Sequence, residues 1–270
     1  MAVESSFAIV WHYFRIWRRF IVMNFRTVTT SWLEFACYVM AKLLRMGFFF
    51  VFVYALFRNT ESLVGYSKGE VLLFFAVMNT VDIAFQLIAR GLTTIPSMVR
   101  RGEYDILLSK PVSPFFASCF KMFDFLDLTT VPAAIAFLGI AIHALPYSVT
   151  PQHVLIAVVC WFCSLVMAVS LNVIIASLAF WFTEIENGFW IYRDLVYVGR
   201  FPPEIYTSSI RTIFTYLIPI LLIVSTPAKA LMGQASFGLV ATGFIVTVLL
   251  VLAARITWQK ALRRYASASA

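Results

Sequence analysis

The segment "HVLIAVVCWFCSLVMAVSLNVIIASLAFWF", residues 153–182, decides the class of fold. It contains no Asp, Glu, Lys or Arg, and it is longer than the roughly 20 apolar residues that an α-helix needs to cross the hydrocarbon core of a bilayer. Lipid offers no hydrogen bonds to the backbone, so a long apolar run inside a membrane must be helical. The segment therefore predicts a transmembrane helix.

The composition of the whole chain agrees with this prediction. Of its 270 residues, 61% are hydrophobic and 13% are charged, whereas about 25% of the residues in a soluble globular domain are charged. The short alternating segments of a transmembrane barrel are absent. The sequence thus predicts an all-α integral membrane protein.

Hydropathy predicts six transmembrane helices in a single domain, residues 1–270. The spans are expected at 31–57, 70–92, 115–143, 153–182, 212–225 and 237–255. The fifth span would be only about 21 Å long, against about 30 Å of hydrocarbon. It contains Pro219 and is followed by Pro227, so we expect a short re-entrant segment between spans five and six.

Residues 7–27, before the first span, predict an N-terminal amphipathic helix. On a helical wheel His12, Arg15, Arg19 and Arg26 share one face, and Phe7, Val10, Trp11, Phe14, Trp17 and Ile21 share another. A basic helix that also carries Trp is typical of segments lying in the membrane interface. A plain cytoplasmic helix is the alternative.

Lys and Arg in the connecting segments predict the orientation, because cytoplasmic loops carry an excess of them. Fifteen are expected on one side: Arg15, Arg18, Arg19, Arg26, Arg90, Arg100, Arg101, Lys110, Arg193, Arg200, Arg211, Arg255, Lys260, Arg263 and Arg264. Three are expected on the other side: Arg58, Lys68 and Lys229. Both termini and the loop after the second span are therefore expected in the cytoplasm.

Sequence motifs of catalysis are missing. The chain has no G-x-S-x-G, no H-E-x-x-H and no G-x-x-x-x-G-K-[ST], so it cannot hold nucleotide phosphates by the P-loop mechanism. The three His show no metal-ligand spacing, and no metal site is predicted. Cys160 and Cys163 lie within an apolar span, which favours packing over redox chemistry.

Polar side chains inside the predicted spans are candidates for a translocation path. Asn79, Asp82 and Gln86 share one face of the second span, and Lys42 and Arg45 share one face of the first. Asp82 and the two cations are expected at similar depth, so the carboxylate should pair with one of them. The spacing fits both a path for substrate and an ion pair that fixes helix packing.

A second charged group lies near the start of the third span. Lys121, Asp124 and Asp127 follow one another at three-residue intervals. We expect them to form a local ion pair that faces the membrane interface.

The predicted cytoplasmic loop, residues 93–114, is the most polar and most punctuated part of the chain. Gly102 should end the helix that arrives from the second span, and Pro111 and Pro114 should stiffen the start of the third. Between them Asp105 precedes three apolar residues, Ile106, Leu107 and Leu108. Such a stiff element could dock on a soluble partner, or be an ordinary interfacial loop.

Several segments resemble one family. "RGEYDILLSKPVSPFF" (101–116) is similar to the Gly-acid-x-Asp-x-Leu-Leu-x-x-Pro-x-x-Pro pattern of ABC-2-type transporter permeases, in particular the short six-span bacterial ones. Further matching segments are "NGFW" (187–190), "RFPPEIY" (200–206), "YLIPILLIVSTPAKALMG" (216–233) and "ALRRYASASA" (261–270). The similarity extends over nearly the whole chain, in the same order.

The resemblance implies a non-enzymatic permease subunit of an ATP-driven transporter, in the bacterial inner (plasma) membrane. It implies a cytoplasmic ABC ATPase dimer, which would bind ATP and Mg, a second permease subunit and surrounding membrane lipid as partners, and no nucleic acid. This chain itself would bind no cofactor. The residues coupled to the ATPase would be Gly102, Glu103, Tyr104, Asp105, Ile106, Leu107, Leu108, Pro111 and Pro114.

Two other functions remain open from the residues alone. Asp82 and Lys42 could form the site of a proton-coupled secondary transporter, although no inverted repeat is visible. The chain could also be a non-transporting scaffold subunit. If it is a permease, export is favoured by the resemblance, and a hydrophobic or amphiphilic small molecule, cationic in view of Asp82, suits the sparsely charged path.

Overall fold

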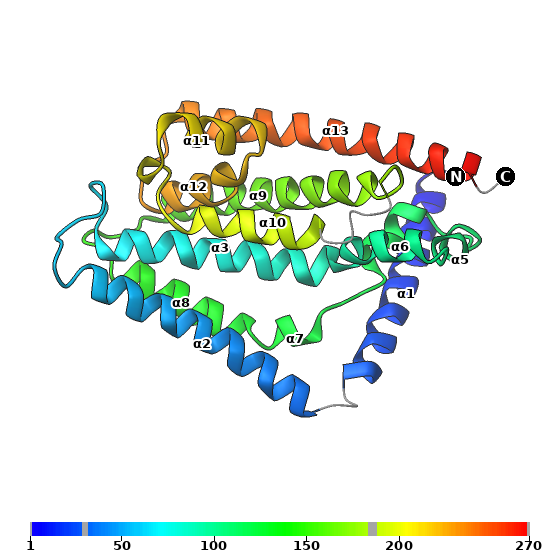
Figure 1. Ribbon diagram of the computed structural model, residues 1–270, viewed down its shortest axis with the longest axis horizontal. Helices are drawn as coiled ribbons and strands as arrows, with labels where there is room; N and C mark the ends of the chain where they lie inside the picture. The colour runs from blue at the N-terminus through cyan, green and yellow to red at the C-terminus, as the bar shows by residue number, and fades with distance from the viewer. Residues whose placement is uncertain (1, 29–31, 183–187, 269–270) are drawn as a thin grey trace.

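A computed structural model describes residues 2–28, 32–182 and 188–268 (Figure 1). Within these ranges the chain is helical and forms no sheet. Four helices are long and apolar enough to cross a membrane: α2 (Trp32–Leu56), α3 (Lys68–Ala89), α9 (Pro151–Leu178) and α13 (Phe237–Ala268). The prediction of an all-α membrane protein is confirmed at this level.

Helix α3 is central and α2 is peripheral. Of the most apolar residues of α3, 72% are buried, against 17% for α2. Helix α3 packs against α8 (Val131–His143) and against α9, which in turn packs against α13. The outward faces of α2 and α13 carry exposed large apolar side chains, as expected for helices that contact lipid or another membrane subunit.

The predicted third span, residues 115–143, is interrupted. It consists of α6 (Pro114–Phe120), α7 (Phe125–Leu128) and α8. Asp124 caps α7 by accepting hydrogen bonds from the backbone N–H groups of Leu126 and Asp127, and Pro132 lies in the first turn of α8. Because a cap and a proline both favour new helix starts, only the 13 residues of α8 form the continuous part.

The orientation predicted from Lys and Arg treated the segment after α9 as a cytoplasmic loop, but its described residues form helices. Helices α10 (Gly188–Val196), η3 (Tyr197–Arg200) and η4 (Pro203–Ile205) run back beside α3. Tyr192 contacts Phe85 at 6.0 Å between ring centroids, whereas the Tyr66 hydroxyl, just before α3, donates to Glu204 Oε2 at 3.0 Å. Arg193 and Arg200 lower the mean hydropathy of this segment, so hydropathy does not predict it as a span. Each of the two guanidinium groups lies over an aromatic ring.

The predicted fifth span, residues 212–225, is not one helix. The chain forms α11 (Ser208–Thr212) and a π-helical turn, η5 (Ile213–Leu217), then bends by 91° into α12 (Ile220–Leu231). Pro219 lies at the bend, where its fixed φ suits the start of a new helix. Helix α12 is almost completely buried and packs against α9.

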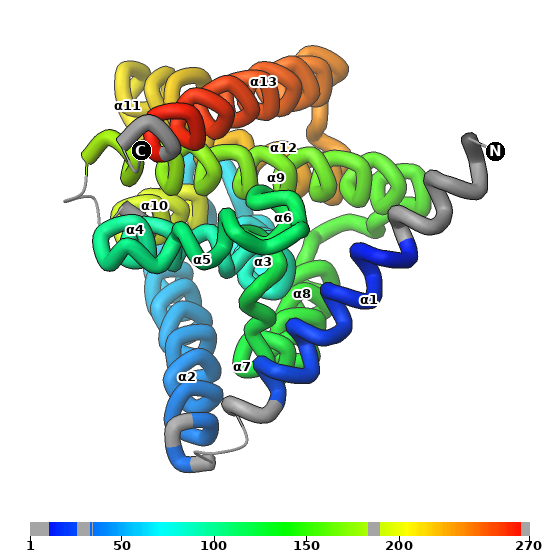
Figure 2. Tube along the Cα trace, turned by 90° about the vertical axis from the view of Figure 1, so that its right-hand side faces the viewer, coloured from blue at the N-terminus to red at the C-terminus, as the bar shows by residue number. Residues whose placement is uncertain are grey.

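The two ends of this bundle are different. One end, which we call the α5 end, carries α1 (Ala2–Val28), α4 (Ile95–Arg100), α5 (Tyr104–Leu108), α6 and the last turns of α13. The opposite end, here the loop end, carries the turns at 57–67 and 144–150 (Figure 1). Figure 2 shows α1 crossing the α5 end obliquely, where Tyr13 contacts Phe116 at 4.6 Å between centroids.

Candidate functional site

Glycine and proline give the segment between α4 and α6 its shape, as the sequence predicts. Helix α4 ends at Arg100, and Gly102 adopts φ +70°, a left-handed conformation that glycine takes at little cost. After α5, Pro111 lies in the turn and Pro114 begins α6. The chain therefore places a one-turn helix at the tip of the α5 end, stiffened on both sides.

One face of α5 is buried against the rest of the protein. The Tyr104 side chain is fully buried, and its hydroxyl lies 3.2 Å from Ser118 Oγ on α6. Its ring meets Phe180, just after α9, at 5.0 Å and Tyr265 on α13 at 5.6 Å, both edge to face. Burial raises the pKa of Tyr104 to about 12, so the hydroxyl stays neutral. Tyr104 therefore links α5 to the end of α9 and to α13.

The other face of α5 is open. Ile106 is 63% exposed and its neighbour Asp105 is exposed too, whereas Leu107 is only 5% exposed and Leu108 is half-buried. The three apolar residues therefore do not project together. Residues three apart share a face of a helix, so Leu107 follows Tyr104 into the core and Ile106 points away from it.

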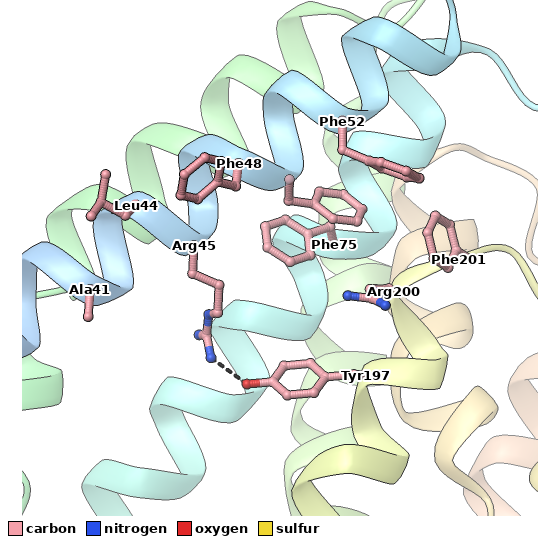
Figure 3. Close-up of a pocket in the computed structure, with 10 residues that line it drawn as sticks. Ala41, Leu44, Arg45, Phe48, Phe52, Phe75, Tyr197, Arg200 and Phe201 are labelled. Carbon is pink, nitrogen blue, oxygen red and sulfur yellow. Dashed lines mark hydrogen bonds between the residues drawn. The ribbon is translucent and has the colours of Figure 1, made fainter.

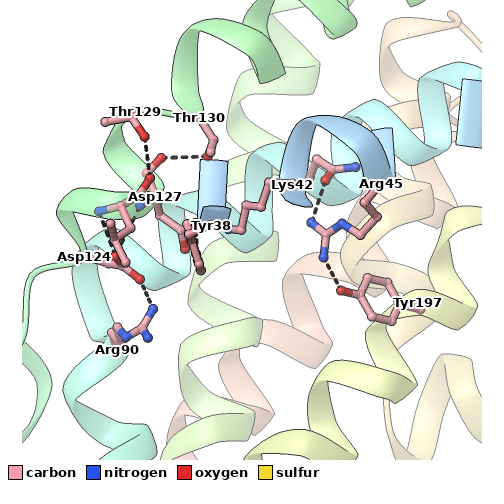
Figure 4. Close-up of polar contacts among 11 residues, drawn as sticks. Tyr38, Lys42, Arg45, Arg90, Asp124, Asp127, Thr129, Thr130 and Tyr197 are labelled. Atoms are coloured by element: carbon pink, nitrogen blue, oxygen red, sulfur yellow. Dashed lines mark hydrogen bonds and ion pairs between the residues drawn. The ribbon is translucent and has the colours of Figure 1, made fainter. Parts of the chain in front are cut away.

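Lys42 pairs with Asp127 rather than with Asp82 (Figure 4). Asp127 is fully buried on α7 and also accepts a hydrogen bond from the Tyr38 hydroxyl at 2.9 Å. In the part of the chain that the structure describes, no cation lies within ion-pair distance of Asp82. The predicted pairing is wrong because the break at α7 brings a carboxylate to α2 that a straight third span would have placed elsewhere.

Asp124 reaches α3 in the same way. It forms an ion pair with Arg90 at the start of η1 (Arg90–Thr94), which continues α3. The expectation of a local ion pair among Lys121, Asp124 and Asp127 is therefore also wrong. Instead, Asp127 on α7 pairs with Lys42 on α2, and Asp124, which caps α7, pairs with Arg90 at the end of α3. The two ion pairs connect α2 and α3 to the segment between α6 and α8.

The remaining path candidates are only partly brought together. Asn79 and Gln86 are buried and Asp82 is half-buried on α3. The Arg45 guanidinium donates to the Tyr197 hydroxyl and, at 3.4 Å, to Asn79 Oδ1. Of these residues only Arg45 lines the pocket of about 650 Å³ between α2, α3 and η3 that Figure 3 shows.

Two carboxylates at the loop end were not singled out from the sequence. Glu204 accepts from Lys229 Nζ at 2.6 Å and from Tyr66. Glu70 accepts from the Tyr147 hydroxyl and from Gln234 Nε2, both at 2.7 Å. Glu204 lies in the segment "RFPPEIY" and Lys229 lies in the segment "YLIPILLIVSTPAKALMG". The opposite charges of these two residues were the signal from which their pairing could have been predicted.

No group of three His, Cys, Asp or Glu side chains that could hold a metal ion occurs among the described residues. A family model described as "ABC-2 family transporter protein" matches residues 43–269. No curated protein and no solved structure matches the chain significantly.

Proposed function

The chain belongs to the ABC-2 family of transporter proteins, and from this premise we propose that it is the permease subunit of an ATP-driven exporter of hydrophobic or amphiphilic small molecules. ATP and Mg would bind to a separate cytoplasmic ABC ATPase dimer, since this sequence has no P-loop. A second permease subunit would complete the pathway across the membrane, and the exposed faces of α2 and α13 are surfaces available to it or to lipid.

The distribution of basic residues supports an orientation with the α5 end in the cytoplasm of a bacterial cell. Thirteen Lys and Arg belong to elements of the α5 end: Arg15, Arg18, Arg19, Arg26, Arg90, Arg100, Arg101, Lys110, Lys121, Arg255, Lys260, Arg263 and Arg264. Four belong to the loop end: Arg58, Lys68, Arg211 and Lys229. Lys42, Arg45, Arg193 and Arg200 lie between the ends. This asymmetry supports cytoplasmic termini, with α1 lying along the inner interface.

In this orientation we propose six crossings, with a different fifth crossing from the one that hydropathy suggested. They are α2, α3, α8, α9, the α10–η3 segment and α13. Residues 208–231 would then form a re-entrant hairpin from the outside. This hairpin begins just after Glu204 and returns to it, because Lys229 near its end pairs with Glu204. Burial of α12 against α9 supplies the protein surroundings that a re-entrant segment needs.

Coupling to the ATPase would run through α5. Its exposed residues, Asp105 and Ile106, would contact the ATPase, while Tyr104 and Leu107 would pass a rigid-body movement to α9 and α13. The ion pairs of Asp124 and Asp127 would extend the movement to α3 and α2. The observation that carries the proposal is that α5 has two different faces. Tyr104 and Leu107 are buried in the protein, whereas the apolar side chain of Ile106 is exposed.

The substitution Ile106→Asp tests this proposal. Burying an Ile in a partner stabilises a complex by about 1.5–3 kcal/mol, and a buried unpaired carboxylate costs more. We expect the variant to insert normally but to retain much less ATPase during purification and to lose ATP-driven transport. Asn59→Asp, which adds the same charge at an exposed position of the loop end, is the matched control. Full ATPase retention by Ile106→Asp would show that α5 is only a connector.

A further inference from the structure

The pocket between α2, α3 and η3 combines an aromatic lining with two positive charges. Its volume of about 650 Å³ lies in the range of about 300–1,000 Å³ that is usual for small-molecule sites. Phe48, Phe49, Phe52, Phe75 and Phe201 provide most of its walls, and Arg45 and Arg200 are its charged residues. Figure 3 shows the two arginines on opposite sides of the pocket, with Phe75 and Tyr197 between them.

Neither guanidinium is neutralised within the described residues. Arg45, the fourteenth of the 25 residues of α2, bonds only to neutral oxygens, and its Nε is buried without a hydrogen-bond partner. Arg200 is exposed and lies over the Phe201 ring at 5.3 Å. No carboxylate of these ranges lies within ion-pair distance of either residue. Charged side chains at membrane depth are costly and usually have a counter-charge, and the described part of the chain supplies none to these two arginines.

We infer that this pocket binds an amphiphilic anion, a compound with a flat or flexible apolar body and a carboxylate, sulfonate or phosphate group. The apolar body would lie against the phenylalanine rings, and the anionic group would lie beside the guanidinium groups of Arg45 and Arg200, which line the pocket. Guanidinium groups suit such ligands because their N–H groups bind two oxygens at once. The inference rests on the proposed function and names its substrate class.

The pocket also revises the charge that the sequence suggested for the substrate. Asp82 was the reason to expect a cation, but Asp82 does not line this pocket. The charged residues that do line it are both arginines, and they come from helices that are distant in the sequence.

A binding measurement on the full-length chain in nanodiscs tests the inference. The probe is 11-(dansylamino)undecanoic acid, whose fluorescence rises in an apolar site, and its uncharged methyl ester is the matched ligand. We expect saturable binding of the acid, at least tenfold tighter than that of the ester after subtraction of protein-free nanodiscs. Arg45→Gln and Arg200→Gln should each weaken binding of the acid by about tenfold or more, the effect of one charged hydrogen bond, with little change for the ester.

The control variants separate charge from general damage. Arg45→Lys keeps the charge and should retain most of the affinity, whereas Arg211→Gln removes a guanidinium that does not line the pocket and should bind like the unchanged chain. Equal affinity for acid and ester, or unchanged binding of the acid by both Gln variants, would overturn the inference. So would loss of a dimer in these variants without loss of probe binding, since the pocket would then be an interface between copies.

Two further arms identify the source of the anion. Phosphatidylglycerol added to phosphatidylcholine nanodiscs should compete with the probe if lipid headgroups are the ligand, and should not compete if the ligand is a free compound. Co-purification of the ATPase is measured in parallel. If the ATPase is retained but the acid does not bind, the inference fails while the proposed function stands. If the acid binds but no ATPase is retained, the proposed function fails.

Discussion

The two ends of the bundle hold their segments together by different forces. At the α5 end, Tyr104 is packed between rings from α13 and from the end of α9. Next to this end, on the connection between α6 and α8, the buried carboxylates of Asp124 and Asp127 pair with half-buried cations. At the loop end, Glu204 and Lys229 form a pair that water can reach. Removing one partner of a pair with a buried carboxylate costs more than removing one partner of a pair that water reaches. The comparison indicates that the loop end opens at lower cost than the α5 end.

The largest effect is expected at Asp127. Asp127→Asn would leave the half-buried Lys42 cation without its counter-charge, and removing one partner of a buried pair costs about 3–5 kcal/mol. We expect a strong loss of thermal stability of the detergent-solubilised protein. The double substitution Lys42→Met with Asp127→Asn removes the stranded charge and should recover much of the loss. An unchanged single variant would show that this end is not held by buried charge.

Tyr104 should give the next largest effect. Tyr104→Ala removes a fully buried ring, and comparable truncations cost about 3 kcal/mol or more. Tyr104→Phe keeps the ring and loses only the contact with Ser118, a hydrogen bond that contributes about 1 kcal/mol. We expect the Ala variant, but not the Phe variant, to separate ATP hydrolysis from transport in the assembled complex. Similar coupling in both variants would remove Tyr104 from the path of movement.

The loop end should show the smallest effect, and one that depends on pH. Burial acts to raise the pKa of Glu204, but the hydrogen bond and charge of Lys229 and the Tyr66 hydroxyl outweigh it, and the pKa is lowered from its ordinary value of 4.5. A lowered pKa stabilises the folded state above pH 4.5, and this contribution is lost as the pH falls through the folded pKa. Thermal stability should therefore decrease below pH 4.5, and less so in Glu204→Gln. Identical pH profiles would exclude Glu204 from this response.

How much the sequence could predict differs along the chain. The long apolar helices α2, α3, α9 and α13 follow from hydropathy because each is continuous and free of internal caps. The proposed fifth crossing could not be found in this way, since Arg193 and Arg200 interrupt the α10–η3 segment. Only the structure shows that each of these arginines lies over an aromatic ring. Pro219 did signal the bend between η5 and α12.

The candidate site was predictable in its position but not in its detail. Gly102 and Pro114 correctly bounded the element that contains α5. Which of its apolar residues face outward depends on the helical phase, and five residues are too few to show a periodicity. The Lys42–Asp127 pair was missed because depth along straight helices paired Lys42 with Asp82, and the break at α7, which brings Asp127 to Lys42, was not expected.

The central claim, that the open face of α5 contacts an ATPase, is tested most directly by photo-crosslinking. A photoreactive amino acid is placed at Ile106, and at Ile135 on α8, which is similarly exposed, as the matched control. The account predicts that Ile106 gives an adduct with a soluble subunit that binds ATP, that its yield changes when ATP is added, and that Ile135 gives none. Absence of the adduct at Ile106, or the same adduct at both positions, would contradict the account.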